Sequence, residues 1–208
     1  MVNIDNKTYK VKRENHYVTK HKKRQIILAG SLRKKNFHIK RLKKKDFGKT
    51  KKWPTYSISR EGVIYQHFDP KYYSDFMGIK EIDKPSISIV LENMGMVFFD
   101  HERNTFLNAI HEECSEDNVY EKNWRGYSYC ETYTDEQYNS TLELCIYLCE
   151  AFNIPRDSFG YNVYHEDTAN FNGVVTRSNF DRDKEDTDLN PSFNFRQFLN
   201  DINEEKNE

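Results

Sequence analysis

Residues 86–93, SISIVLEN, decide the fold that the sequence predicts. They form a short run rich in β-branched apolar residues, and the larger polar residues Glu92 and Asn93 come only at its end. Such a run is typical of a strand buried on both faces of a sheet. Open α/β sheets bind ligands at the carboxyl ends of their strands, so we expect a site beside Glu92 and Asn93.

Other segments can be placed around this strand. Residues 25–30, QIILAG, predict a core strand, and residues 53–69 predict a β-hairpin that turns at Gly62. Thr134 and Gln137 form a capping box that begins an amphipathic helix, which ends before Pro155. A closing helix follows Pro191.

The remaining segments give weaker patterns. Residues 31–52 predict a basic surface loop or a short basic helix. We expect residues 96–100 to continue residues 86–93 or pair with them, and residues 101–133 to be irregular. Residues 159–167 predict a strand or extended segment, and residues 173–180 predict a strand.

The 208 residues favour one α/β domain over residues 25–202, preceded by a basic arm (1–24) and followed by a charged tail (203–208). The 14 Phe and 14 Tyr residues supply core volume. No apolar run approaches the roughly 20 residues of a membrane helix, and no apolar segment of a secretory signal begins the chain. We therefore expect no membrane contact and a cytoplasmic protein with reduced thiols, of which Cys145 and Cys149 pack in the core.

Charge divides the chain in two. Residues 1–60 hold 20 Lys and Arg against 3 Asp and Glu, whereas residues 61–208 hold 12 against 30. The simpler interpretation is that the basic part wraps around the acidic part. The alternative is that residues 7–52 bind an external polyanion, such as nucleic acid or teichoic acid.

The ordered segments resemble the zinc-dependent N-acetylmuramoyl-L-alanine amidases and the peptidoglycan recognition proteins of the same fold. The resemblance covers residues 25–202 and rests on REGVIYQ, SISIVLEN, TDEQYNSTLELCIYLCEAFNIP, GVVTRSNF and DTDLNPSFNFRQF. It implies a mixed central β-sheet flanked by helices, with a basic N-terminal extension here. In active members, two His and one Asp or Cys hold a zinc ion that activates water for hydrolysis of peptidoglycan.

The resemblance places residues that cannot hold zinc at two ligand positions. Ala29 stands at the first ligand and Arg177 at the second, while Asp188 stands at the third. One carboxylate cannot hold zinc alone, and an arginine repels a cation. We therefore expect no metal here, and we predict that Arg177 and Asp188 form an ion pair in its place.

The catalytic positions are altered as well. Val90 stands where the family has its acid/base Glu, and Asp186 stands where it has a Lys. Tyr56 stands at the catalytic Tyr/His position of the hairpin, or Thr55 does if the register shifts by one residue. These positions predict that the chain is not an active zinc amidase.

A relocated metal site is the alternative. His165, Glu166 and Asp167 form a cluster near the right part of the chain, with Asp181, Asp183 and Asp186 close by in sequence. Solvated loop carboxylates are the simpler interpretation. His38 and His67 are isolated in the sequence and are given no role.

The sequence leaves four functions open. The first is an inactive amidase-like module that is structural or binds peptidoglycan in a groove that the aromatic loop 67–77 helps to line. The second is a structural component of a phage particle, in contact with other virion subunits. The third is an active amidase with relocated zinc ligands, and nucleic-acid binding is a weaker fourth. The binding candidates are Tyr56, Glu92, Asn93, Arg177 and Asp188.

Overall fold

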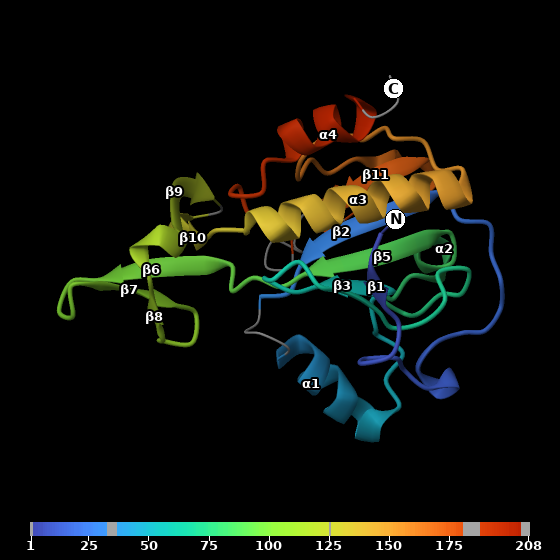
Figure 1. Ribbon diagram of the computed structural model, residues 1–208, viewed down its shortest axis with the longest axis horizontal. Helices are drawn as coiled ribbons and strands as arrows, with labels where there is room; N and C mark the ends of the chain where they lie inside the picture. Colours follow the sequence, from blue (N-terminus) through green and yellow to red (C-terminus); the bar gives the residue numbers. More distant parts are fainter. Residues whose placement is uncertain (1, 33–36, 125, 181–187, 205–208) are drawn as a thin grey trace.

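The computed structural model describes residues 2–32, 37–124, 126–180 and 188–204. Its larger sheet has six strands in the order β1-β4-β3-β5-β2-β11. Helices α3 and α4 cover one face of this sheet, and α1 lies on its other side (Figure 1). The predicted mixed central sheet flanked by helices is thereby confirmed. The strands are β1 (Ile4–Asp5), β2 (Gln25–Gly30), β3 (Tyr56–Ile58), β4 (Ile64–Gln66), β5 (Ser86–Leu91) and β11 (Gly173–Thr176).

The central strand β5 is buried along its whole length, as predicted for residues 86–93, although it ends at Leu91. It runs parallel to both neighbours, β3 and β2. Ile87, Ile89 and Leu91 belong to the main core beneath α3 and α4. Ser88 and Val90 alternate with them and face the opposite side of the sheet, because successive side chains of a strand point to opposite faces.

Helix α3 (Asp135–Phe152) begins at the predicted capping box. The Thr134 hydroxyl accepts a hydrogen bond from the Gln137 backbone N–H (3.1 Å), and the Gln137 side chain accepts one from the Thr134 N–H (3.3 Å). Gln137 Nε2 also donates to the Glu92 carbonyl (2.7 Å), which joins the helix to the end of β5. Cys145 and Cys149 lie in the main core, so the prediction that they pack there is confirmed. Helix α4 (Phe195–Glu204) closes the fold.

The predicted hairpin is formed by β3 and β4, which pair antiparallel. Gly62 adopts φ +76° in its turn. A Cβ at this position would lie 2.8 Å from the Glu136 carbonyl of α3, so the turn needs glycine for both conformation and space.

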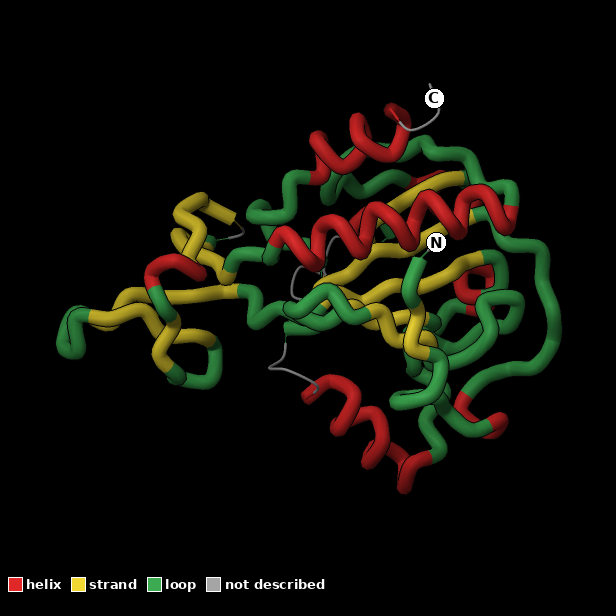
Figure 2. The backbone as a smooth tube through the Cα atoms, in the orientation of Figure 1, coloured by secondary structure: helices red, strands yellow, loops and turns green. Residues whose placement is uncertain are grey.

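A second, five-stranded sheet extends away from the domain (Figures 1 and 2). We call residues 96–131 the side sheet; its strand order is β8-β7-β6-β10-β9. The prediction of irregular structure for residues 101–133 is therefore wrong, and residues 96–100 pair within this sheet rather than with β5. Most of β9 is exposed, so no apolar stripe marks it in the sequence. The strands are β6 (Met96–Asp100), β7 (Thr105–Asn108), β8 (Glu113–Cys114), β9 (Val119–Trp124) and β10 (Tyr127–Glu131).

Two further predictions need correction. Residues 159–167 form turns that lead into a 3-10 helix, Glu166–Asn170, instead of a strand. Residues 173–180 are a strand only as far as Thr176, because Asn179 Oδ1 accepts the Thr176 N–H (2.6 Å) and turns the chain into a second 3-10 helix, Arg177–Asn179.

The N-terminal arm joins the domain instead of remaining apart. Its strand β1 pairs parallel with β4 at the edge of the larger sheet. Buried Lys23 donates to the carbonyls of Tyr72 (2.7 Å), Lys84 (2.8 Å) and Ser86 (3.0 Å). These bonds tie the arm to the loop before β5.

Candidate functional site at the carboxyl ends of the strands

A groove of about 560 Å³ lies where β2, β5 and β11 end. Helix α1 (Phe37–Lys44) and the start of the side sheet contribute further walls. We call it the sheet-end groove. This is the position that the predicted sheet favours for ligands. Its lining residues are Gly30, Ser31, Leu32, His38, Arg41, Leu42, Lys45, Lys52, Pro54, Phe76, Val90, Met94, Met96, Ala109 and Arg177.

The lining combines apolar walls with positive charge. Arg41, Lys45, Lys52 and Arg177 are cationic, and none of the described lining residues is acidic. The groove therefore favours a ligand that has both an anionic group and an apolar part.

The floor of the groove is apolar where two parallel strands meet. Ala29 of β2 and Val90 of β5 are register partners, and register partners of adjacent strands point to the same face. Val90 lines the groove, and Ala29 is fully buried. Neither side chain can donate or accept a proton or bind a metal.

Arg177 enters the groove because β11 ends one residue before it. Its guanidinium lies over the ring of Phe76, 5.2 Å from the centroid. The loop that carries Phe76 is held by the Asp83 carboxylate, which accepts the backbone N–H groups of Met77 (2.8 Å), Gly78 (3.0 Å) and Ile79 (3.2 Å). Burial raises the pKa of Asp83 to about 6.

Asp188 lies next to this turn. Its side chain is buried, and Oδ2 accepts a hydrogen bond from the backbone N–H of Ser178, the residue after Arg177. Asp188 and Arg177 are therefore neighbours in space as well as in the family pattern. The ion pair between their side chains stays a prediction.

A hydrogen-bonded chain of three side chains lies behind the groove wall. His38 Nε2 is 3.1 Å from Ser57 Oγ, and Ser57 Oγ is 2.7 Å from His67 Nε2. His67 Nδ1 is 3.0 Å from the carbonyl oxygen of Tyr9 in the arm. His38 is on α1, Ser57 on β3 and His67 just after β4, so the sequence gives no sign that they meet. The prediction that His38 and His67 have no special role missed this chain.

The hydrogen-bond partners of His38, Ser57 and His67 determine which of their atoms carry a proton. Burial lowers the pKa of His38 to about 3 and of His67 to about 4, so both rings are neutral at pH 7. A carbonyl only accepts, so His67 Nδ1 carries the proton and Nε2 accepts from the Ser57 hydroxyl. The Ser57 oxygen then accepts from His38 Nε2, which fixes the tautomers of both histidines.

Four of the five binding candidates are absent from the described lining of the groove: Asp188 and the three residues Tyr56, Glu92 and Asn93. Tyr56 is 1% exposed and packs in the main core, because it faces α3. Glu92 and Asn93 are also buried. Asn93 Nδ2 donates to the carbonyl of Glu131 (3.1 Å), and Asn93 Oδ1 accepts from Asn190 (3.0 Å), so Asn93 joins the two sheets. These residues do not line the sheet-end groove, so their part in binding stays a prediction, and of the aromatic loop 67–77 Phe76 alone is among the described lining residues.

The proposed relocated metal site receives no support from the described residues. His165 accepts a hydrogen bond from the Asp167 N–H (3.2 Å) and its ring stacks on Phe159, 4.3 Å between centroids. Asp181, Asp183 and Asp186 lie outside the described residues. In the part of the chain that the structure describes, no group of three or more His, Cys, Asp or Glu side chains is arranged to hold a metal.

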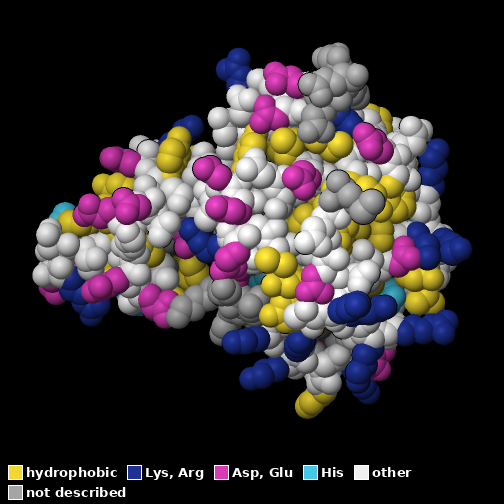
Figure 3. All heavy atoms as spheres, in the orientation of Figure 1, with side chains coloured by type: hydrophobic (Ala, Val, Ile, Leu, Met, Phe, Trp, Pro, Cys, Tyr) yellow, Lys and Arg dark blue, Asp and Glu magenta, His cyan; other side chains and the backbone are white. Residues whose placement is uncertain are grey.

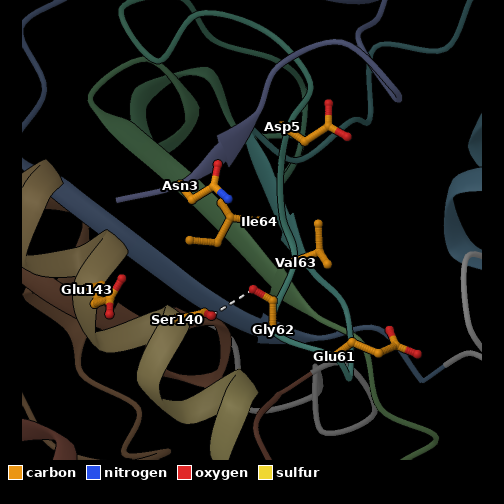
Figure 4. A pocket seen from close by; sticks show the side chains of 8 residues that line it. All are labelled: Asn3, Asp5, Glu61, Gly62, Val63, Ile64, Ser140 and Glu143. Carbon is orange, nitrogen blue, oxygen red and sulfur yellow. Dashed lines mark hydrogen bonds between the residues drawn. The ribbon is translucent and has the colours of Figure 1, made fainter. Parts of the chain in front are cut away.

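A second hollow, of about 270 Å³, lies between the arm, the hairpin turn and α3 (Figure 4). Its carboxylates, Asp5, Glu61 and Glu143, lie on different sides of it in Figure 4 and do not converge. Ser140 Oγ donates to the Gly62 carbonyl (2.7 Å) at its base. We therefore assign the ligand site to the sheet-end groove.

Comparisons with known proteins agree with this fold. The sequence model of the N-acetylmuramoyl-L-alanine amidase family matches residues 13–186, and the chain therefore belongs to that family. The match begins within the arm, before the residue 25 predicted as the domain start. No curated protein matches the chain.

Solved structures of an amidase, an endolysin and a hydrolase are similar over most or all of their length. The amidase LysC from Clostridium intestinale is 13% identical, with 98% of this chain and 97% of that chain covered and a TM-score of 0.54. A mutant endolysin from Bacillus subtilis is 16% identical, with 97% and 99% covered and a TM-score of 0.55. Staphylococcus aureus AmiA, solved with its ligand, is 12% identical, with 98% and 82% covered and a TM-score of 0.52. At these identities the comparisons show a shared fold.

The described residues of the groove do not fit the zinc ion that the family implies. Its lining contains one residue type that binds zinc, His38, and Nε2 of that ring is already bonded to Ser57. Arg177 adds positive charge, and a positive charge beside a metal ion opposes its binding. We therefore derive no chemical step through zinc.

Among the described residues, no helix has the length and apolarity needed to span a membrane.

Proposed function

We propose that this chain is an amidase-family protein that binds a peptidoglycan fragment in the sheet-end groove and does not hydrolyse it with zinc. The observation that carries the proposal is the apolar pair of Ala29 and Val90 beneath a groove that contains Arg177. A groove lies at the ligand-binding end of the sheet, and the one residue of its described lining that is of a zinc-binding type, His38, is bonded to Ser57. The fold of the amidase relatives supports the choice of ligand.

The groove chemistry suits such a fragment. The stem peptide of an N-acetylmuramoyl peptide carries carboxylates for Arg41, Lys45 and Arg177. Its lactyl and methyl groups can contact Leu32, Met94 and Met96 of the apolar wall. Ion pairs formed inside a partly enclosed groove are screened less than those on an open surface.

Calorimetry with an N-acetylmuramoyl peptide, combined with metal analysis and turbidity of a cell-wall suspension, tests the proposal. We expect binding, no zinc that copurifies, and no loss of turbidity. Zinc at about one ion per chain together with loss of turbidity would show an active amidase. Absence of heat at millimolar peptide would exclude the binding role.

A pair of tryptophan substitutions locates the bound peptide. Ala109 is exposed at the groove, and Ala151 is exposed on α3 away from it. Ala109→Trp should fill part of the groove and weaken peptide binding about tenfold, equivalent to about 1.4 kcal/mol. Ala151→Trp should leave the affinity unchanged. Equal affinities of the two variants would place the peptide elsewhere.

A further inference from the structure

Between described residues, few ion pairs join the basic part of the chain to the acidic part. Of the ion pairs between described residues, one joins residues 1–60 to residues 61–208: Arg60 with Glu131, at 3.3 Å. The other ion pairs stay within one part or the other. The interpretation that the basic part wraps an acidic part stays a prediction, and for the described cations at α1 no ion pair supports it.

The unneutralised charge gathers on α1. Arg41 and Lys45, the residue directly after α1, are four positions apart, and both line the groove, as does Lys52. Lys40 and Lys44 form a second exposed row, also one turn apart, which is a rise of about 6 Å. None of these five cations pairs with a described acidic residue. In Figure 3, Lys and Arg side chains gather along the lower edge of the molecule, where Figure 1 shows α1.

Two rows of like charge repel each other within the folded chain. A ligand with one or two carboxylates can neutralise at most the cations that line the groove. A linear polymer that repeats its negative charge can satisfy both rows and continue along them. The arrangement therefore favours a polyanion over a single small anion.

The residue types favour phosphate as the repeated charge. Four of the five cations are lysines, whose ammonium groups are point charges on flexible stems. The fork of arginine matches carboxylate and phosphate alike, whereas the point charge of a lysine can approach a tetrahedral phosphodiester from many directions.

The aromatic residues disfavour nucleic acid. Single strands bind by stacking their bases on exposed aromatic rings. Phe76 lies in the groove, but the Arg177 guanidinium lies over its ring. Phe47 is fully exposed after α1 but does not line the groove.

We propose that the two basic rows of α1, with Lys52, bind a linear phosphodiester polymer without bases, of the polyol-phosphate type. The interaction does not require a peptide in the groove, because Lys40 and Lys44 lie outside its lining. The polymer site shares Arg41 and Lys45 with the proposed peptide site and extends beyond it through Lys40 and Lys44.

Fluorescence anisotropy with labelled poly(glycerol phosphate) tests the proposal. For about four phosphate contacts, we expect the logarithm of the binding constant to fall with the logarithm of salt concentration at a slope of about −3. Lys40→Glu/Lys44→Glu should weaken binding more than tenfold and make the slope shallower. The matched control is Lys20→Glu/Lys22→Glu, two exposed lysines of the arm, which should change the affinity less than twofold.

Other outcomes would overturn the proposal. No binding at low salt, or equal losses in the two double variants, would exclude α1 as the site. Equal affinity for polyglutamate of the same charge would exclude phosphate recognition. Tighter binding of an oligonucleotide, abolished by Phe47→Ser, would assign the surface to nucleic acid. Lys40→Glu/Lys44→Glu should lose affinity for the polymer and keep its affinity for the muramoyl peptide. The two binding measurements are independent, so either proposal can fail while the other holds.

Discussion

Ala29 and Val90 are register partners on adjacent parallel strands near the point where β2 and β5 end; Val90 lines the groove, and Ala29 beside it is fully buried. The family resemblance places a zinc ligand at the first position and an acid/base Glu at the second. The pairing of β2 with β5 places these two positions side by side, although neither Ala29 nor Val90 has a reactive side chain.

Arg177→Gln should weaken the muramoyl peptide about tenfold or more, because a hydrogen bond to a charged group contributes about 1.5–3 kcal/mol. Isothermal titration calorimetry measures the change. Arg103→Gln, on the exposed side sheet, is the matched control and should leave affinity unchanged. If Arg177→Gln binds as the parent does, the anionic group of the ligand lies elsewhere.

Ser57→Ala should lower the free energy of unfolding by about 1–3 kcal/mol, because it removes the shared partner of two buried imidazole nitrogens. Urea unfolding measures the loss. Nitrogen NMR of the parent protein should show the proton on Nδ1 of His67 and on Nε2 of His38. The opposite tautomer at either ring would contradict the assigned chain.

The stability of the protein should fall in acid through His38 and His67. Folding lowers both pKa values from 6.5, to about 3 and about 4. Each histidine therefore makes its full contribution to the stability of the protein above pH 6.5, the pKa that it has in the unfolded chain. This contribution is lost as the pH falls from 6.5 through the folded values.

His67→Gln tests this pH dependence, because glutamine can still accept from Ser57 but does not titrate. The variant should show a shallower loss of melting temperature between pH 6.5 and pH 4 than the parent. His101→Gln, an exposed histidine of the side sheet, serves as the control and should keep the parental slope. A slope unaffected by His67→Gln would mean that other groups govern acid unfolding.

Gln137→Ala should destabilise the protein by about 2–3 kcal/mol, since it removes half of a capping box and leaves the buried Glu92 carbonyl without this donor. Chemical unfolding measures the difference. Glu136→Gln, exposed on the same helical turn, should cost less than about 0.5 kcal/mol. Similar losses for the two variants would show that the link to β5 contributes little.

Much of the fold could be predicted because its signals are local. The apolar run at residues 86–93, the Gly62 turn and the capping box at Thr134 each specify one element within a few residues. The sequence patterns do not reveal the side sheet, because its strands are short and most positions of β9 and β10 are exposed. Pairing between the strands, rather than burial of side chains, stabilises them. The tight turn after Thr176 depends on the side chain of Asn179, which a strand pattern does not reveal.

The sequence by itself determined the order of the elements, the amidase-like fold and the uneven distribution of charge. Only the tertiary structure decided which side chains meet. Tyr56 and Ser57 are adjacent in sequence, yet the alternation of a strand buries the first under α3 and joins the second to His38 and His67. Arg177 and Phe76 are far apart in the chain, and the parallel strands with their long connections bring them to one groove. Ala29 and Val90 meet for the same reason, because register between parallel strands is set by the whole sheet and not by either strand alone.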